Sequence, residues 1–240
     1  MRHLYHAIGL LLLSFSLYAQ KDTTIILTGG VGFQNLGKTQ TLTLLTIPQE
    51  LSNRYEANSQ QHTFFSPQLF IGRTILKRYF TKLQLGVTAG YVSNLSTSGI
   101  VQQFALATFD NLNYSYHIQN RRLMGTLTFS HAFASPWFYY FNASAGLANN
   151  GSHDYQELPR FLGAEPMSPY RNNTVSSLTY HFGLGITAYI DHSWSASVGY
   201  QFADFGQAQL GTSLAQSTNQ RLTINHLYVN QILLSISLDC

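Results

Sequence analysis

The chain has 240 residues, of which 10% are charged and 14% are aromatic, and its mean hydropathy is -0.04. A soluble domain carries charge on about 25% of its residues, so this chain lacks the charge to coat a water-facing surface, and its hydropathy is too low for a bundle of membrane helices. The formal net charge of +3, without a long basic cluster, argues against a nucleic-acid partner.

The first twenty residues, MRHLYHAIGLLLLSFSLYAQ, predict a secretory signal peptide. Arg2 precedes an apolar run from Ala7 to Leu17, which is shorter than the roughly 20 residues that a spanning helix needs. The small residue Ala19 suits a cleavage site, so we expect residues 1–19 to be removed and residues 20–240 to form the mature domain. A membrane-anchor helix is the alternative.

Eight stretches with a period of two follow along the chain. In SSLTYHFGLGITAYI, every second residue from Leu178 is apolar, and the residues between them are mostly small or uncharged polar, which is the pattern of a strand with two different faces. The stretches are Thr24 to Phe33, Phe64 to Ile75, Phe80 to Val92, Asn113 to Phe129, Trp137 to Ala148, Ser176 to Ile190, Trp194 to Phe202 and Leu222 to Leu238. In the fourth stretch the pattern changes phase around Asn120, which predicts a β-bulge there.

The connections between these stretches alternate in length. The long ones are 34–62, 93–112, 149–173 and 206–221, and the short ones are 76–79, 130–136 and 191–193. In an up-and-down barrel this order places every long loop on one rim and every short turn on the other, as in outer-membrane barrels. We therefore predict an all-β fold: an eight-stranded antiparallel up-and-down transmembrane β-barrel with four long extracellular loops and three short periplasmic turns. The alternation of residues 39–47 indicates that the first two strands extend beyond the membrane.

The alternation also predicts which side chains face lipid and which face the lumen. The apolar set is expected to contact lipid: Leu85, Val87, Leu178, Tyr180, Phe182, Leu184, Ile186, Val198, Tyr200, Ile232, Leu234 and Ile236. Five polar strand residues are candidates for a hydrogen-bonded lumen network: Arg73, Lys82, Gln84, His181 and Gln201. Aromatic residues beside the short turns predict a girdle at the membrane interface: Tyr79, Phe80, Trp137, Tyr139, Tyr189 and Trp194.

One stretch carries a family resemblance. VGYQFADFGQAQLG (198–211) resembles the seventh strand and following loop of small eight-stranded OmpA-like and opacity-type outer-membrane proteins, in which a Gly-Tyr-x-aromatic stretch runs into an acidic-aromatic-Gly turn. Residues 99–127 and 226–238 are similar to members from gammaproteobacteria. The resemblance implies an outer-membrane barrel with a structural or surface-exposed role. Such barrels usually end in an aromatic residue, whereas this sequence ends in Asp239-Cys240.

Catalytic chemistry has weak support in the sequence. His153-Asp154 with Ser152 beside it has the residue types of a protease-like site, but consecutive side chains point in different directions, so we expect an exposed polar loop. His117 and His181 fall within strands, and no spacing suggests a metal site. We expect no catalytic residue, no cofactor and no metal.

The leading functional hypothesis is a non-enzymatic barrel in the outer membrane of a Gram-negative bacterium, with an adhesion-like or envelope-integrity role. A narrow channel for small solutes is the alternative, and a lipid- or peptide-modifying barrel enzyme is a weaker one. The expected partners are outer-membrane lipids and lipopolysaccharide, with a host or envelope surface ligand bound through the long loops. Those loops are poor in charge and partly apolar, so they either bind a ligand or pack on each other.

Overall fold

The computed structural model describes residues 22–34, 39–45, 51–58, 62–166, 170–213 and 216–240. The expected signal peptide, residues 1–19, lies outside these ranges. Strands make up most of the described chain: β1 (Thr23–Gln34), β2 (Gln40–Leu45), β3 (Leu51–Ala57), β4 (His62–Arg78), β5 (Thr81–Gln102), β6 (Asp110–Ala134), β7 (Trp137–Pro159), β8 (Asn173–Tyr189), β9 (Trp194–Asp204), β10 (Ala208–Gln209), β11 (Thr223–Ile224) and β12 (Tyr228–Asp239). Two 3₁₀ turns, η1 (Gln103–Ala105) and η2 (Ala107–Phe109), join β5 to β6. Within the described ranges, no helix is long and apolar enough to cross a membrane.

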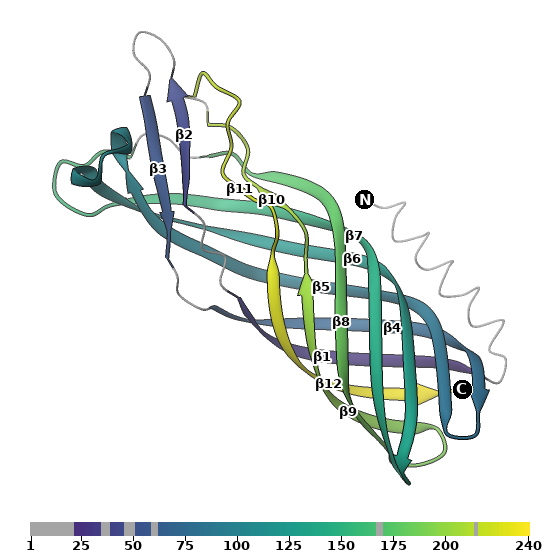
Figure 1. Cartoon of the computed structure of the whole chain (residues 1–240). Coiled ribbons are helices and arrows are strands. Elements are labelled where there is room, and N and C mark those ends of the chain that lie inside the picture. The colour runs from purple at the N-terminus through teal and green to yellow at the C-terminus, as the bar shows by residue number, and fades with distance from the viewer. Residues whose placement is uncertain (1–21, 35–38, 46–50, 59–61, 167–169, 214–215) are drawn as a thin grey trace.

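Eight of these strands close into a barrel (Figure 1). The order around the ring is β5-β4-β1-β12-β9-β8-β7-β6, and β6 pairs back with β5. All neighbours are antiparallel, and β1 pairs with β12 from Thr24–Asp239 to Gln34–Val229, which joins the first and last strands. The predicted eight-stranded up-and-down barrel is confirmed, and so is the sorting of short and long connections to opposite rims.

Three neighbouring strands are much longer than the sequence pattern predicted. β5, β6 and β7 have 22, 25 and 23 residues. Much of the two connections predicted at 93–112 and 149–173 is therefore strand. The first long connection contains a hairpin of its own, β2–β3, whose second strand pairs with the extension of β5 through Glu56 and Ile100. Above the ring the fold is thus a curved sheet of β2, β3, β5, β6 and β7 (Figure 1).

Along β6, the inward face changes from apolar to polar residues and the outward face changes from polar to apolar residues. Between Leu112 and Ile118 the inward side chains are apolar and buried, and the outward ones, such as Asn113, are polar. Between Thr126 and Phe129 the inward side chains are threonines, and the outward ones are exposed and apolar. The alternation of burial runs through Asn120 without a break, so the bulge predicted in this strand is wrong. The change of phase in the sequence marks a change of surroundings, from water outside the wall to an apolar medium.

An irregularity does lie at this level, in the facing strand. The register of β5 against β6 shifts between Val92 and Leu95, opposite Asn120 and Ile118. One extra residue of β5 is accommodated there, which is the geometry of a β-bulge. The shift thus falls where the wall changes from one type of surface to the other.

The lower part of the barrel carries an exposed apolar band on its outer wall. Large apolar side chains point outward from all eight strands of the ring, among them Leu27, Leu69, Leu85, Leu127, Phe141, Leu184, Val198 and Leu234. Soluble proteins rarely expose so much contiguous apolar surface. The ring leaves no strand edge unpaired, which hydrocarbon surroundings require. The fold is therefore that of a transmembrane β-barrel.

Candidate functional site

The inner wall of the membrane-spanning half is a hydrogen-bonded polar network. Thr126 accepts a hydrogen bond from Ser144 (2.7 Å), and the Ser144 hydroxyl also bonds His181 Nε2 (2.7 Å). On the neighbouring strands β9 and β12, Gln201 donates to Gln231 (3.0 Å). The network surrounds a cavity of about 100 Å³. This lumen has room for a few waters, because one water occupies roughly 30 Å³ in the liquid.

An ion pair lies at the short-turn end of this cavity. Lys82 Nζ lies 2.9 Å from both carboxylate oxygens of Asp239, and the two side chains are 16% and 26% exposed. Thr24 and Tyr189 donate hydrogen bonds to the same carboxylate, at 2.5 Å and 3.2 Å. Since Thr24 and Asp239 lie on the first and last strands, this cluster also fastens the seam of the barrel.

Beyond the other end of the cavity, the chain that leaves β9 turns into the barrel. Gly206, with φ of +83°, turns this segment inward, and a Cβ there would lie 2.1 Å from Ser177 Oγ. Phe205 is fully buried, and its ring lies 4.1 Å from Arg122 Cζ. Arg122 donates to Asn120 Oδ1 (2.8 Å) and Ser66 Oγ (2.9 Å). Both side chains are buried inside the barrel, beyond the residues that line the cavity.

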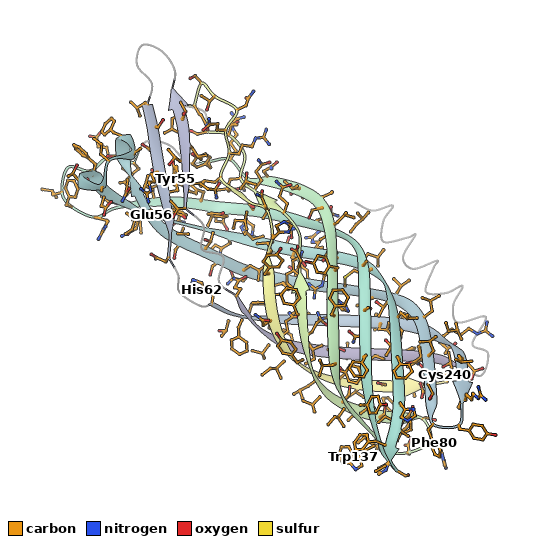
Figure 2. All side chains as sticks on the ribbon, in the orientation of Figure 1. Tyr55, Glu56, His62, Phe80, Trp137 and Cys240 are labelled. Atoms are coloured by element: carbon orange, nitrogen blue, oxygen red, sulfur yellow. The ribbon has the colours of Figure 1, made fainter. Side chains whose placement is uncertain are left out.

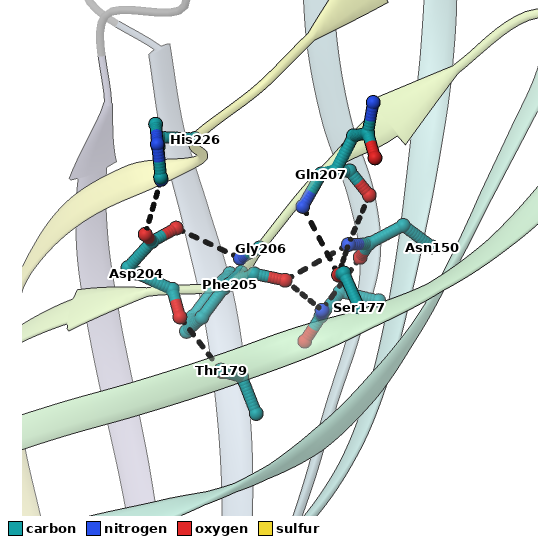
Figure 3. Close-up of polar contacts among 9 residues, drawn as sticks. Asn150, Ser177, Thr179, Asp204, Phe205, Gly206, Gln207 and His226 are labelled. Atoms are coloured by element: carbon teal, nitrogen blue, oxygen red, sulfur yellow. Dashed lines mark hydrogen bonds and ion pairs between the residues drawn. The ribbon is translucent and has the colours of Figure 1, made fainter.

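Two side chains lock this inward segment in place (Figure 3). Asn150 Nδ2 donates to the carbonyl oxygens of Phe205 and Gln207, both at 2.8 Å. The carboxylate of Asp204 accepts the Gly206 N–H at 2.8 Å and lies 2.7 Å from His226 Nδ1. Asn120 adds a bond to Asn150 Oδ1 at 2.7 Å. We call Asn120, Arg122, Asn150 and Phe205 the closure layer.

Above the closure layer the interior is apolar. Five tyrosines from β3, β6, β7 and the chain before β8 pack edge to face or stacked, with ring centroids 4.9 to 6.4 Å apart: Tyr55, Tyr114, Tyr116, Tyr155 and Tyr170. The loop between β9 and β12 covers them with Leu210, Leu222 and Leu227, all buried. This tyrosine core closes the barrel a second time, outside the membrane.

The tyrosine core predicts a loss of stability at high pH. Burial raises the pKa of Tyr55 to about 12, and burial also raises the pKa values of Tyr114 and Tyr116. The folded pKa values exceed the unfolded value of about 10, so this contribution to stability is complete below pH ~10 and is lost as the pH rises further. Near-ultraviolet circular dichroism should therefore be constant to about pH 10 and fall above it. A loss of that signal between pH 7 and 9 would contradict the assignment.

The structure places most predicted strand residues as the alternation indicated. The predicted lipid-facing side chains all point outward, and Leu178 is 77% exposed. Lys82, Gln84, His181 and Gln201 line the cavity. Tyr79, Phe80, Trp137 and Trp194 are exposed at the short-turn rim, and the half-buried Tyr139 points outward on β7. Figure 2 shows Phe80 and Trp137 near Cys240 at this end of the molecule. Contact of these side chains with lipid is a proposal.

Two predicted positions are wrong. Arg73 was expected in the lumen, but it is exposed on the outer face of β4, because Phe70 and Gly72 take the inward positions there. Tyr189 was expected in the outer aromatic girdle, but it lines the cavity and bonds Asp239. It shares the parity of His181 and Thr187, which face the lumen.

The structure does not bring Ser152 together with His153 and Asp154, the three residues considered for catalysis. His153 Nδ1 lies 2.7 Å from Asp154 Oδ2 on the outer wall of β7, where both side chains are partly or fully exposed. Ser152 is buried and faces the opposite side of that strand. The Asp204–His226 pair was missed by the sequence reasoning, because its members are 22 positions apart with no local signal. Among the described residues, no group of three His, Cys, Asp or Glu side chains could hold a metal ion.

No family model and no curated protein matches this sequence. Solved structures with a similar outline include Neisserial surface protein A, at 10% identity over 90% of this chain and 97% of that one, with a TM-score of 0.49. The outer membrane protease OmpT from Escherichia coli has 9% identity over 91% and 97%, with a TM-score of 0.49. The outer membrane protein OprG from Pseudomonas aeruginosa has 10% identity over 92% and 98%, with the same TM-score. None of these likenesses carries a function over to this chain.

Proposed function

We propose that the chain is an outer-membrane barrel of a Gram-negative bacterium that does not conduct solutes and that holds a rigid β-structure outside the cell. Its short turns, the start of β1 and the end of β12 face the periplasm, and the sheet extension faces outward, as in outer-membrane barrels. The removal of residues 1–19 on export remains part of this proposal. The lipids of the outer membrane and its lipopolysaccharide are then the partners of the apolar band.

The closure layer is the observation that carries this proposal. A channel needs a continuous polar path, but the residues that line the cavity stop short of Arg122 and Phe205, which are both buried inside the barrel. Beyond it lies the tyrosine core, which buries apolar side chains as a soluble protein does. The alternative of a narrow channel is therefore disfavoured. The sheet extension has a buried core of its own, and an ordered structure outside the barrel favours a surface or envelope role over transport.

Conductance measurements test the closed lumen. The purified protein in planar bilayers should give no stepwise conductance, because water and ions have no path through the closure layer. The variant Phe205→Gly/Arg122→Ser removes the buried ring and guanidinium of the closure layer, and it should also give no conductance steps, because the tyrosine core still closes the barrel. Reproducible conductance steps from the wild-type protein would refute the proposal and restore the channel hypothesis.

A further inference from the structure

The extracellular sheet ends in an apolar tip. Six large side chains are exposed at the end of β7 and in the connections that follow β5 and β7: Phe104, Leu106, Phe109, Leu158, Phe161 and Leu162. Leu162 is 103% exposed, so its side chain projects freely from the turn. Figure 1 shows these connections at the end of the molecule opposite the short turns. We call these six residues the apolar tip.

The two connections are fastened to each other. Gln103 Nε2 donates to the carbonyl oxygen of Glu165 (3.1 Å), and Asn111 Nδ2 donates to Gln103 Oε1 (2.7 Å). The Arg160 N–H donates to the carbonyl oxygen of Asn111 (2.9 Å). Gln103 and Asn111 are buried, so this amide bridge presents the tip as one rigid unit. Phe104, with φ of +59°, holds a left-handed conformation that a non-glycine residue rarely adopts.

The apolar tip is separate from the apolar band of the barrel. On β6 the outward side chains change from Leu123 and Leu127 in the band to polar ones between Asn113 and Arg121. This polar stretch measures roughly 25–30 Å along the strand, which exceeds the depth of a headgroup layer. The tip is therefore held away from the bilayer that surrounds the barrel, and a different apolar surface must cover it.

We propose that the apolar tip inserts into the interface of a second lipid bilayer. This inference rests on the proposed function, because it requires the sheet extension to face outward. The tip consists of six exposed side chains from two short segments, whereas a stable protein interface needs about 800 Å² of matched surface on each partner. Protruding leucine and phenylalanine side chains need no matching shape in a fluid interface, where apolar side chains lie about 5–10 Å deep. Residues 103–109 carry no charge, and the other half of the tip, residues 158–162, carries one, the exposed Arg160, so insertion should depend only weakly on anionic lipid.

Vesicle binding by the whole protein in lipid nanodiscs tests the inference. Wild-type nanodiscs should co-sediment with phosphatidylcholine vesicles. The variant Phe104→Asn/Phe161→Asn/Leu162→Asn should bind at least roughly a hundredfold more weakly, since each buried side chain of this size contributes about tenfold or more. Asparagine tolerates the left-handed conformation at position 104, so the amide bridge is kept.

Two controls separate lipid from other partners. Asn113→Ser/Gln156→Asn changes the polar wall and should bind as the wild type does. The exchange Phe161→Leu/Leu162→Phe keeps the apolar area but alters the shape, and it should also bind normally. Failure of wild-type nanodiscs to bind vesicles, or equal binding by the triple variant, would overturn the inference. Loss of binding in the exchange variant would also overturn it, because it would indicate a shape-specific protein partner. A closed lumen without vesicle binding would refute this inference alone.

Discussion

Replacing Phe205 with alanine is expected to lower the free energy of unfolding by about 3–5 kcal/mol, the range for removing a large buried aromatic side chain. The ring is fully buried, packs edge to face on Phe64 with centroids 6.2 Å apart, and lies 4.1 Å from Arg122 Cζ. Its removal leaves a cavity beside a buried cation whose Nε has no hydrogen-bond partner. Denaturant unfolding of the refolded protein in detergent micelles measures the change.

Phe202→Ala is the matched control for this prediction. Phe202 lies three positions earlier, at the end of β9, but points to the outer wall and is half-buried. Its ring stacks on Tyr228. In micelles detergent covers the outer wall, so Phe202→Ala leaves no buried cavity, and its loss of unfolding free energy should be clearly smaller than that of Phe205→Ala. If the two alanine variants lost equal stability, the closure layer would not hold the lumen shut in the way described above.

The second large effect concerns the assignment of Leu184 to lipid. An arginine at position 184 should cost roughly 2–4 kcal/mol in vesicles, because it must enter hydrocarbon at mid-depth or reach out of it. Leu178→Arg, nearer the outer rim, should cost roughly 0–1 kcal/mol. Refolding equilibria in vesicles and in micelles give both values, and the difference should shrink in micelles, where a charge reaches water easily.

Gly185→Arg fails for a different reason. A Cβ at Gly185 would lie 2.3 Å from the carbonyl oxygen of Val198 and 2.7 Å from Tyr140 Cε1. This crowding is steric, so its cost should be the same in vesicles and in micelles. Equal costs for Leu184→Arg and Leu178→Arg in vesicles would show that this face does not meet lipid.

The strands and their order could be predicted because the apolar band imposes a strict alternation. From Leu178 to Ile186, apolar residues on the lipid side alternate with small or polar residues on the lumen side. This alternation matches the two-residue period of a strand. The short turns follow from the same pattern, because the alternation stops on either side of them. Most of the transmembrane part of the fold is thus visible in local sequence.

The extension beyond the membrane was not visible for a physical reason. Along β6 the inward residues stay on the even positions from Leu112 to Thr128, but apolar side chains move from even to odd positions at the membrane boundary. The sequence pattern shows which side of a strand is apolar, but not which side faces inward. The move of apolar residues from even to odd positions therefore resembled a β-bulge. The region 93–112 looked like a loop because its apolar residues are buried in a core rather than in lipid.

The candidate site escaped prediction because it is assembled from distant segments. Phe205 lies between the predicted strand 194–202 and the predicted connection 206–221, and only the pairing of β8, β9 and β12 brings it next to Asn150 and Arg122. Arg73 was misplaced because polarity alone does not decide the side of a wall near the rim, where a long side chain reaches water from either face.

The exchange of faces along β5, β6 and β7 has a consequence for how the molecule reaches its place. The outer wall above the band contains Arg121 and Asn149, and these side chains must pass the hydrocarbon before they meet water on the far side. An arginine at the bilayer midplane costs roughly 2–4 kcal/mol. During this passage the side chains of the tyrosine core have not yet packed against one another. With the extension outside the cell, as proposed above, we expect insertion to meet a kinetic barrier, which should be lower in a bilayer that is thinned or locally opened.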